Sequence, residues 1–421
     1  MTRLEITPLR HPISARVCIP GSKSYTNRAL ILSALTRGST VLKNPLYSQD
    51  TAAMIDCLQT LGISIEKRPD QLIVHGDVSS IEEKTYHLFA HDSGTTVRFL
   101  LAFLCIVPGV KRLEGSKRLN ERPIQDLVDS LRELGAEITY CEQKGQLPVQ
   151  ISTSFLFGKS VHLKSDQSSQ FCSALLLIAP HLSEGLTIDL TCPLISKPYV
   201  DMTLSCMQDW GANVFVEEGK QYFIPPQPGY RKEEYVIEGD FSSAGYFFAI
   251  AALTQSMLLL DNLNPFSAQP DRKFLKILER IGALAIYEKE PLRIQGKELC
   301  ALEIDMEDCP DQVMTLAVLS AFSKGATKIS GVRSLRVKET ERVLALRTEL
   351  KKMGIRTEET LNTLTIYGGS PRGAAIDTYN DHRIAMSFAV AGLRLPGIVI
   401  HQPEVVNKTF PAFWDRFRTF Q

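Results

Sequence analysis

Several basic side chains in this sequence stand at or near the predicted starts of helices. Lys23 and Arg28 lie in PGSKSYTNRA, where small polar residues precede an apolar helical pattern, and His382 and Arg383 hold a similar place in YNDHRIAM. A helix start offers backbone N–H groups that have no partner within the helix, and these groups attract anions. Arg binds phosphate or carboxylate through two parallel hydrogen bonds, whereas Lys is a compact charge that also exchanges protons. The pattern predicts a site for phosphorylated or carboxylated small molecules.

Acidic residues stand close to these cations and are candidates for proton transfer. Asp311 lies in CPDQVMTL, and Glu339 lies in LRVKETER between Lys338 and Arg342. Cationic neighbours favour the ionised form of a carboxyl group, and carboxylates with distinct partners suit acid–base chemistry. Taken alone, LRVKETER is better explained by a solvated helix face with ordinary surface ion pairs. The residues by themselves leave two classes open, a two-domain binder and a transferase of small polyanions.

The stretch HDSGTTVRFLLAF at 91–103 carries a charge that opposes anion binding. Its small polar residues precede an apolar run, which predicts a helix start, but the carboxylate of Asp92 repels phosphate. We hypothesise that Asp92 caps this helix through a side-chain oxygen, while Gly94 and neighbouring basic residues meet the ligand. The segment 112–124, predicted as a loop, supplies Arg118 and Arg122.

Composition excludes several classes of protein. Lys and Arg together number 47, as do Asp and Glu, so the overall charge indicates neither nucleic acid nor an anionic membrane surface as a partner. The cysteines are scattered singly without zinc-ligand spacing, which predicts free thiols in a reducing compartment and no metal site. The first residues lack a signal-peptide pattern, and no apolar stretch reaches the roughly 18–20 residues needed to span a bilayer. We therefore expect a cytoplasmic protein with no membrane partner.

The helix-start pattern recurs along the chain. Polar residues followed by an apolar run rich in Ala and Leu occur at 20–35, 165–179, 239–253, 309–322 and 379–393. An acidic residue falls at about the same phase in five of the repeats, namely Asp92, Asp166, Asp240, Asp311 and Asp381. Since these helices are apolar nearly all round, we expect them to be buried in the domain centres.

A glycine keeps the same interval and marks the end of a second helix in each repeat. The pattern is an amphipathic helix, a Gly at the C′ position and a departing strand, as in LQTLGISIE. These glycines are Gly62, Gly135, Gly211, Gly282 and Gly354. A period of about 72 residues suits a compact β/α unit with two helices and several strands. Six units would form two domains of three, with a boundary near IPPQPGYRKEEY at 224–235.

Together the motifs resemble those of a known family. PGSKSYTNRALILSAL, SGTTVRFL, SDQSSQFCSALLL, SKPYVDMT, LRVKETERV, YNDHRIAM and NKTFP are similar, in order and from end to end, to the motifs of 3-phosphoshikimate 1-carboxyvinyltransferases, the EPSP synthases. The patterns PGSKSxTNRA and LRxKExxR are highly specific for that family.

The resemblance implies an α/β fold in the form of a two-lobed inside-out α/β barrel with six βαβαββ repeats, three per lobe. The implied lobes are residues 21–237 and residues 1–20 plus 238–421, with the active site in the cleft between them. The implied reaction transfers the enolpyruvyl group of phosphoenolpyruvate to the 5-hydroxyl of shikimate 3-phosphate, by addition and then elimination of phosphate. The resemblance implies no metal or organic cofactor, and it implies a monomer.

Site residues are carried over from the family motif by motif. Asp311 resembles the base that faces the 5-hydroxyl, Glu339 the acid that protonates the methylene carbon, and Lys23 a third catalytic group. The implied shikimate 3-phosphate site comprises Lys23, Ser24, Arg28, Ser168, Ser169, Gln170, Ser196, Tyr199, Asp311, Ser334 and Lys338. The implied phosphoenolpyruvate site comprises Lys23, Asp92, Gly94, Arg122, Gln170, Arg342, His382, Arg383 and Lys408.

Two positions depart from the family pattern, and two other functions compete with the main one. The family normally has Asn where Asp92 stands and usually Asn where Ser334 stands, while Gly94 matches its glyphosate-sensitivity glycine. A sister enzyme transfers enolpyruvyl to UDP-N-acetylglucosamine, but the matching stretch 110–124 lacks the cysteine of that enzyme. A non-catalytic phospholigand-binding descendant is the other alternative, for which Asp92 is the only real argument.

Overall fold

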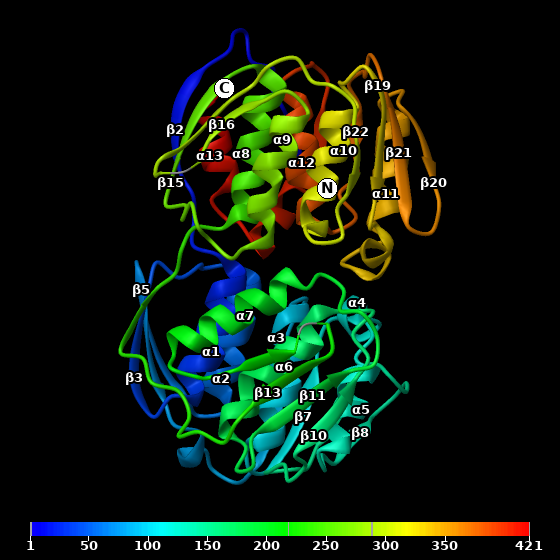
Figure 1. Ribbon diagram of the computed structural model, residues 1–421. Coiled ribbons are helices and arrows are strands. Elements are labelled where there is room, and N and C mark those ends of the chain that lie inside the picture. The colour runs from blue at the N-terminus through cyan, green and yellow to red at the C-terminus, as the bar shows by residue number, and fades with distance from the viewer. Residues whose placement is uncertain (1, 218, 288, 421) are drawn as a thin grey trace. The chain divides into compact units, whose positions relative to one another are not determined.

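A computed structural model of the protein describes residues 2–217, 219–287 and 289–420. The chain divides into two compact units, one formed by Gly21–Ile237 and the other by Met1–Pro20 together with Glu238–Gln421. Helices and strands alternate in both units (Figure 1), so the mixed α/β class expected from the sequence is confirmed. Among the described residues, no helix has both the length and the apolar character that crossing a membrane requires.

In the unit Gly21–Ile237, three four-stranded sheets share one strand order. In the sheet β6-β7-β9-β8 the first two strands are parallel, and β9 lies antiparallel between β7 and β8. The sheets β10-β11-β13-β12 and β14-β3-β5-β4 repeat this arrangement. The strands are β3 (Gly38–Lys43), β4 (Ser64–Arg68), β5 (Gln71–Gly76), β6 (Thr85–Phe89), β7 (Val110–Glu114), β8 (Ile138–Tyr140), β9 (Val149–Ile151), β10 (Ser160–Leu163), β11 (Leu186–Leu190), β12 (Phe215–Glu217), β13 (Gln221–Ile224) and β14 (Glu234–Val236). The helices are α1 (Lys23–Leu35), α2 (Gln49–Thr60), α3 (Gly94–Phe103), α4 (Lys117–Asn120), α5 (Gln125–Glu133), α6 (Ser169–Ile178) and α7 (Pro198–Asp209).

The second unit contains the same strand order twice, in the sheets β2-β15-β17-β16 and β18-β19-β21-β20, and a three-stranded sheet β1-β23-β22. Its strands are β1 (Arg3–Glu5), β2 (Ser14–Cys18), β15 (Met257–Asp261), β16 (Leu284–Ile286), β17 (Leu292–Gln295), β18 (Glu303–Asp305), β19 (Gly325–Ser330), β20 (Arg356–Glu359), β21 (Thr363–Gly368), β22 (Ala375–Ile376) and β23 (Val399–His401). Its helices are α8 (Phe241–Thr254), α9 (Lys273–Arg280), α10 (Val313–Ser320), α11 (Arg342–Lys352), α12 (His382–Gly392) and α13 (Phe413–Arg418), with 3₁₀ turns η4 (Pro270–Arg272), η5 (Pro310–Gln312), η6 (Arg333–Val337) and η7 (Pro403–Lys408).

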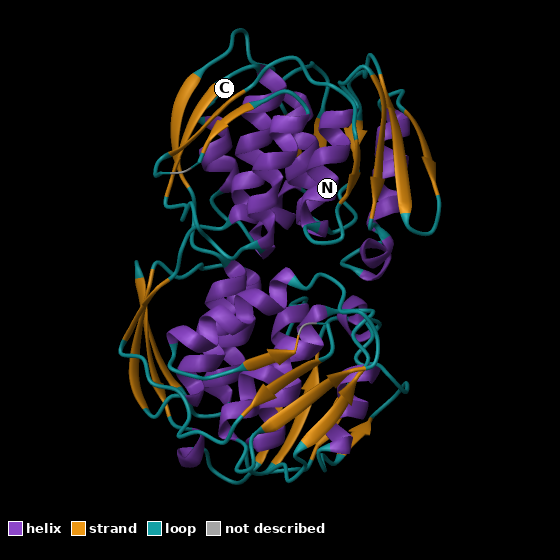
Figure 2. Ribbon diagram, in the orientation of Figure 1, coloured by secondary structure: helices purple, strands orange, loops and turns teal. Residues whose placement is uncertain are grey.

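The helices that begin with polar residues form the buried centre of each unit, as predicted. Nearly every residue of α8, α10 and α12 is buried, and α1, α3 and α6 are buried in the other unit. Figure 2 shows the helices of each unit gathered together, with the strands in separate sheets beside them. Burying these apolar helices removes large areas from water, which is the main force that holds each unit together.

The repeating glycines lie where the sequence predicts them. Each follows directly on the C-cap residue of α2, α5, α7, α9 or α11. Their φ angles are 100° at Gly62, 96° at Gly135, 84° at Gly211, 113° at Gly282 and 81° at Gly354. Residues with a Cβ are strained in this left-handed region, so glycine is the natural end for these helices.

The chain crosses between the units after Pro20 and after Ile237, and an asparagine holds both crossing segments in each unit. In one unit, Asn44 donates from Nδ2 to the Ile237 carbonyl at 2.8 Å, and a Cβ on Gly21 would lie 2.0 Å from the Asn44 carbonyl oxygen. In the other, Asn262 donates from Nδ2 to the Ile19 carbonyl at 2.7 Å, and a Cβ on Gly239 would lie 1.8 Å from the Asn262 carbonyl oxygen. Backbone can approach that closely only at glycine.

Candidate functional site

The first turns of four helices converge in the unit Gly21–Ile237. Lys23, at the start of α1, places Nζ 3.0 Å from Oδ2 of Asp50 in the first turn of α2. The carbonyl of Asp50 accepts a hydrogen bond of 3.3 Å from Thr96 of α3. Thr95, its neighbour on α3, accepts a bond of 3.0 Å from the amide of Gln170 at the start of α6. The N-terminal ends of α1, α2, α3 and α6 are therefore linked at one place, which is favourable for an anion. We call the set Lys23, Asp50, Thr95, Thr96 and Gln170 the helix-start cluster.

Asp50 contacts a predicted site residue, and sequence reasoning missed it. Its side chain is buried, and it pairs with a Lys23 side chain that is also mostly buried. The pair fixes the direction of the ammonium group, because a buried carboxylate needs a charged or hydrogen-bonding partner. The only sequence signal for this role is an acidic residue just inside a helix start, which the helix dipole explains equally well.

The amide of Gln170 has one orientation imposed by α3. Its Oε1 accepts from Arg98 Nη1 at 2.6 Å, while its Nε2 donates to Thr95 Oγ1 at 3.0 Å. Ser168 caps α6 by accepting from the Gln170 backbone N–H at 3.3 Å, and Ser169 is buried in the first turn. Arg98 is thus a positioning residue for Gln170.

Arg28 is tied into α7. Its Nε donates to Thr203 Oγ1 at 2.8 Å, and its Nη2 donates to the Tyr199 carbonyl at 2.9 Å. Nη1 bonds the carbonyl of Ser24 at 3.0 Å. Burial lowers the pKa of the Arg28 guanidinium. Arg28 therefore joins the start of α1 to the segment that carries Ser196 (φ 51°) and Tyr199.

Gly94 lies directly beneath the guanidinium of Arg122. A Cβ on Gly94 would lie 2.6 Å from Arg122 Nη1 and 3.0 Å from its Cζ. Both residues are buried. The sequence places Arg122 in a loop, and this is correct, but Lys117–Asn120 forms the short helix α4 and carries Arg118, which pairs with Glu121 on the surface.

The hypothesis that Asp92 caps α3 is wrong. Ser93 is the N-cap and accepts from the Thr96 backbone N–H, whereas Asp92 Oδ1 accepts a bond of 2.5 Å from Ser116 Oγ ahead of α4. The shared phase of the acidic residues predicts the N-cap correctly in only some of these helices. Asp240 and Asp381 cap α8 and α12, but the N-caps of α1, α3 and α6 are serines. A serine hydroxyl satisfies an N-terminal N–H as well as a carboxylate does.

In the other unit, one arginine contacts three carboxylates. Arg342, the first residue of α11, donates from Nε to Asp381 Oδ2 at 2.7 Å, from Nη1 to Asp311 Oδ1 at 3.1 Å and from Nη2 to Glu339 Oε2 at 2.9 Å. Arg342 is 1% exposed, and Asp381 is fully buried. Burial alone would lower the pKa of Arg342, but Asp381, Glu339 and Asp311 raise it above its usual value, so this charge is permanent.

Arg383 holds the second oxygen of Asp311. Its Nη2 lies 2.7 Å from Asp311 Oδ2, and its Nη1 donates to the hydroxyl of Tyr246 at 3.3 Å. The Arg383 backbone N–H donates to Asp381, the N-cap of α12, at 2.9 Å. We call the set Asp311, Glu339, Arg342, Asp381 and Arg383 the arginine–carboxylate cluster. It combines fixed cations with two partly exposed carboxylates, Asp311 and Glu339, as anion binding with proton transfer requires.

Other predicted residues of this unit lie on nearby elements. His382 is buried in the first turn of α12, with Nδ1 3.8 Å from Asp381 Oδ1, and Lys408 is buried at the end of η7. Ser334 lies in η6 with a buried hydroxyl that has no hydrogen-bond partner within the described ranges, and Lys338 follows η6 directly.

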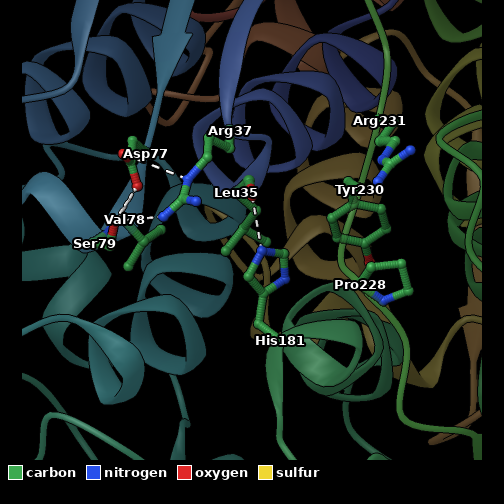
Figure 3. A pocket seen from close by; sticks show the side chains of 9 residues that line it. All are labelled: Leu35, Arg37, Asp77, Val78, Ser79, His181, Pro228, Tyr230 and Arg231. Carbon is green, nitrogen blue, oxygen red and sulfur yellow. Dashed lines mark hydrogen bonds and ion pairs between the residues drawn. The ribbon is translucent and has the colours of Figure 1, made fainter.

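A pocket of about 490 Å³ in the unit Gly21–Ile237 shares no residue with the predicted site. Figure 3 shows Arg37 turned toward Asp77 and Ser79, and His181 turned toward the carbonyl of Leu35. In the part of the chain that the structure describes, no group of three or more His, Cys, Asp or Glu side chains is arranged to hold a metal ion.

The fold and the two clusters define an α/β enzyme for small phosphorylated and carboxylated substrates. The solved structure of EPSP synthase from Acinetobacter baumannii matches with a TM-score of 0.82 and 25% identity, covering 100% of this chain and 98% of that one. The family model described as EPSP synthase (3-phosphoshikimate 1-carboxyvinyltransferase) matches residues 9–417.

Curated relatives agree with this match. The 3-phosphoshikimate 1-carboxyvinyltransferase of Trichormus variabilis is 39% identical over 420 residues, covering 99% of each chain. That of Syntrophobacter fumaroxidans is 38% identical over 409 residues, covering 96% of each chain. The chain therefore belongs to the EPSP synthase family. It is a transferase that moves the 1-carboxyvinyl group of phosphoenolpyruvate to shikimate 3-phosphate in the shikimate pathway, which confirms the main prediction over the UDP-sugar alternative.

Proposed function

We propose that the predicted residues divide the work of this reaction between the two clusters. The observation that carries the proposal is the placement of Asp311, whose two oxygens are held by Arg342 and Arg383, with Glu339 on another N–H group of Arg342. In this proposal, Asp311 is the base and Glu339 is the acid. Both contact the arginines that bind phosphoenolpyruvate. Lys408, Arg122 and Gln170 complete the phosphoenolpyruvate contacts in this proposal.

In the addition step, Glu339 starts as the protonated acid, gives its proton to the methylene carbon of phosphoenolpyruvate and becomes a carboxylate. The 5-hydroxyl oxygen of shikimate 3-phosphate then bonds to the adjacent carbon, and Asp311 takes the hydroxyl proton. In the elimination step, the carbon–oxygen bond to phosphate breaks, and phosphate leaves with the proton that Asp311 took from the hydroxyl. A methyl proton returns to the Glu339 carboxylate, which restores the vinyl group and the starting state of both carboxyl groups. Ionised carboxylates stabilise the cationic carbon, and the arginines stabilise the departing phosphate.

The helix-start cluster suits the other substrate. The N-terminal ends of α1 and α6, with Lys23, Ser168 and Ser169, supply donors for the phosphate and hydroxyl groups of shikimate 3-phosphate. The remaining contacts in the proposal come from Ser24, Arg28, Ser196, Tyr199, Ser334 and Lys338. Finer expectations belong here too: an inside-out arrangement of the sheets around the helices, a monomer, and a cytoplasmic enzyme that needs no metal or organic cofactor.

Arg342→Lys tests the proposed site, with Arg347→Lys as a control on the same helix. Lys keeps the charge but loses the fork that meets three carboxylates. We expect kcat/KM for phosphoenolpyruvate to fall at least a hundredfold for Arg342→Lys, by analogy with the loss of a transition-state donor. Arg347 pairs with Glu359 on the half-exposed side of α11, and its variant is expected to stay within about twofold of the parent. Equal activity of the two variants would refute the assignment.

A further inference from the structure

A buried carboxylate lies on α11 beyond the arginine–carboxylate cluster. Glu349 is fully buried. Its Oε1 accepts from the hydroxyl of Tyr379 at 2.6 Å, and its Oε2 accepts from the backbone N–H of Asp377 at 3.1 Å and from Lys352 Nζ at 2.8 Å. Burying a carboxylate is costly unless its oxygens are satisfied, so these bonds define where the group can sit.

Two of these partners belong to the loop that leads into α12. The loop continues through Tyr379 and Asn380, whose φ angles are 53° and 55°. Two successive non-glycine residues in the left-handed region are strained, and such a conformation persists only where surrounding contacts hold it. Asp381 follows at once, and it both caps α12 and receives Arg342. Strain in this loop is therefore stored immediately beside the cluster.

Arg342 and Glu349 lie about two turns apart on α11, which places them on the same face of the helix. That face meets the loop at Asp381 through Arg342, and at Asp377 and Tyr379 through Glu349. The loop is thus fixed to α11 at both of its ends. Breaking the contact at Tyr379 removes the bond to Glu349 from the strained residues just before Asp381, while the bond from the Asp377 N–H to Glu349 remains.

The network continues outward but remains within this unit. Lys352 Nζ also lies 2.7 Å from Asp377 Oδ2, and His401 Nδ1 lies 2.8 Å from Asp377 Oδ1. Asp377 follows β22, and His401 ends β23, so the sheet edge supports the same loop. The side chains of these outer groups are partly exposed. The hydroxyl of Tyr379, in contrast, donates to the carboxylate of Glu349, which is fully buried.

We propose that Glu349 and Tyr379 are positioning residues for phosphoenolpyruvate. Their bond holds the strained loop so that Asp381 presents Arg342 and Arg383 in the geometry that binds this substrate. The inference rests on the proposed function, since it takes these two arginines as phosphoenolpyruvate ligands. Neither Glu349 nor Tyr379 is assigned a contact with a substrate.

Tyr379→Phe tests the proposal, because it removes one hydroxyl and keeps the ring. The matched control is Tyr367→Phe in the same unit, where the hydroxyl donates to Glu358 Oε2 at 2.7 Å on the exposed surface. We expect Tyr379→Phe to raise KM for phosphoenolpyruvate about tenfold, in the range by which contacting residues couple, with KM for shikimate 3-phosphate within about twofold. Tyr367→Phe is expected to change neither constant.

The outcomes separate this inference from the proposed function. A lower melting temperature with an unchanged KM for phosphoenolpyruvate would show a structural role only and overturn the proposal. Should Tyr379→Phe fail to fold, Glu349→Gln is measured against Glu358→Gln, and failure of both Tyr379→Phe and Glu349→Gln to fold also overturns it. If Arg342→Lys impairs phosphoenolpyruvate use but Tyr379→Phe does not, this inference alone fails. If Arg342→Lys has no effect, the proposed site itself fails.

Discussion

Adding one methyl group at Gly94 is expected to weaken phosphoenolpyruvate binding through Arg122. The new Cβ would lie 2.6 Å from Nη1, 3.0 Å from Cζ and 3.2 Å from Nη2, where ordinary contact begins at 3.4 Å. Because the backbone of α3 is buried and helical, the Arg122 guanidinium must move away by about 1 Å. A displacement of about 1 Å can lower the rate about a hundredfold.

The size of the effect follows from the bond that Arg122 would lose. A hydrogen bond to a charged group contributes about 1.5–3 kcal/mol, which corresponds to about a ten- to hundredfold change in an equilibrium constant. We therefore expect Gly94→Ala to raise KM for phosphoenolpyruvate about ten- to hundredfold and to leave KM for shikimate 3-phosphate nearly unchanged. Steady-state phosphate release, with each substrate varied in turn, measures both constants.

The control is Gly369→Ala, where an added Cβ meets nothing within 4 Å. That variant is expected to match the parent in both constants and in melting temperature. A Gly94→Ala enzyme whose KM for phosphoenolpyruvate stays within twofold of the parent would refute the link between this glycine and Arg122. A rise in both KM values together would instead indicate a general disturbance of α3.

Two further predictions concern charged side chains. Asp92→Asn keeps an oxygen for the Ser116 hydroxyl but removes a charge that repels phosphate. KM for phosphoenolpyruvate should therefore fall about two- to fivefold. An unchanged or higher KM in the same assay would count against the repulsion. Burial, followed by the negative charge of Asp311, raises the pKa of Asp271 from 3.8 to about 6. Between these two pH values the folded protein therefore binds more protons at Asp271 than the unfolded chain does. The parent should therefore lose stability relative to Asp271→Asn as the pH rises from 4 to 6, by about 2 kcal/mol in urea unfolding. A difference independent of pH would contradict this.

Local signals in the sequence were enough to place the helices and their ends. A glycine after an amphipathic run predicts a left-handed C′ residue because the physics lies within a few residues, and all five predicted glycines have it. The apolar runs after polar starts predict buried helices for the same reason. The choice of cap was less certain, since Ser93 and Asp92 stand side by side and either side chain could reach the free N–H groups.

Pairings between distant segments were beyond sequence reasoning. Lys23 and Asp50 lie on different helices, as do Arg342 and Asp381, and only the fold brings each pair together. The phase of the repeat marks Asp381 as an acidic residue near a helix start, but nothing local signals its bond to Arg342. Motif resemblance supplied the candidate residues, whereas the orientation of each group came from tertiary contacts such as those that hold Gln170.

The most direct test of the central claim is phosphate release when the purified protein is mixed with phosphoenolpyruvate and shikimate 3-phosphate. We predict one phosphate released for each phosphoenolpyruvate consumed, a product that carries the carboxyvinyl group on the 5-hydroxyl, and no release when either substrate is omitted. Release that requires UDP-N-acetylglucosamine as the acceptor, or no release above background while shikimate 3-phosphate still binds, would contradict the account.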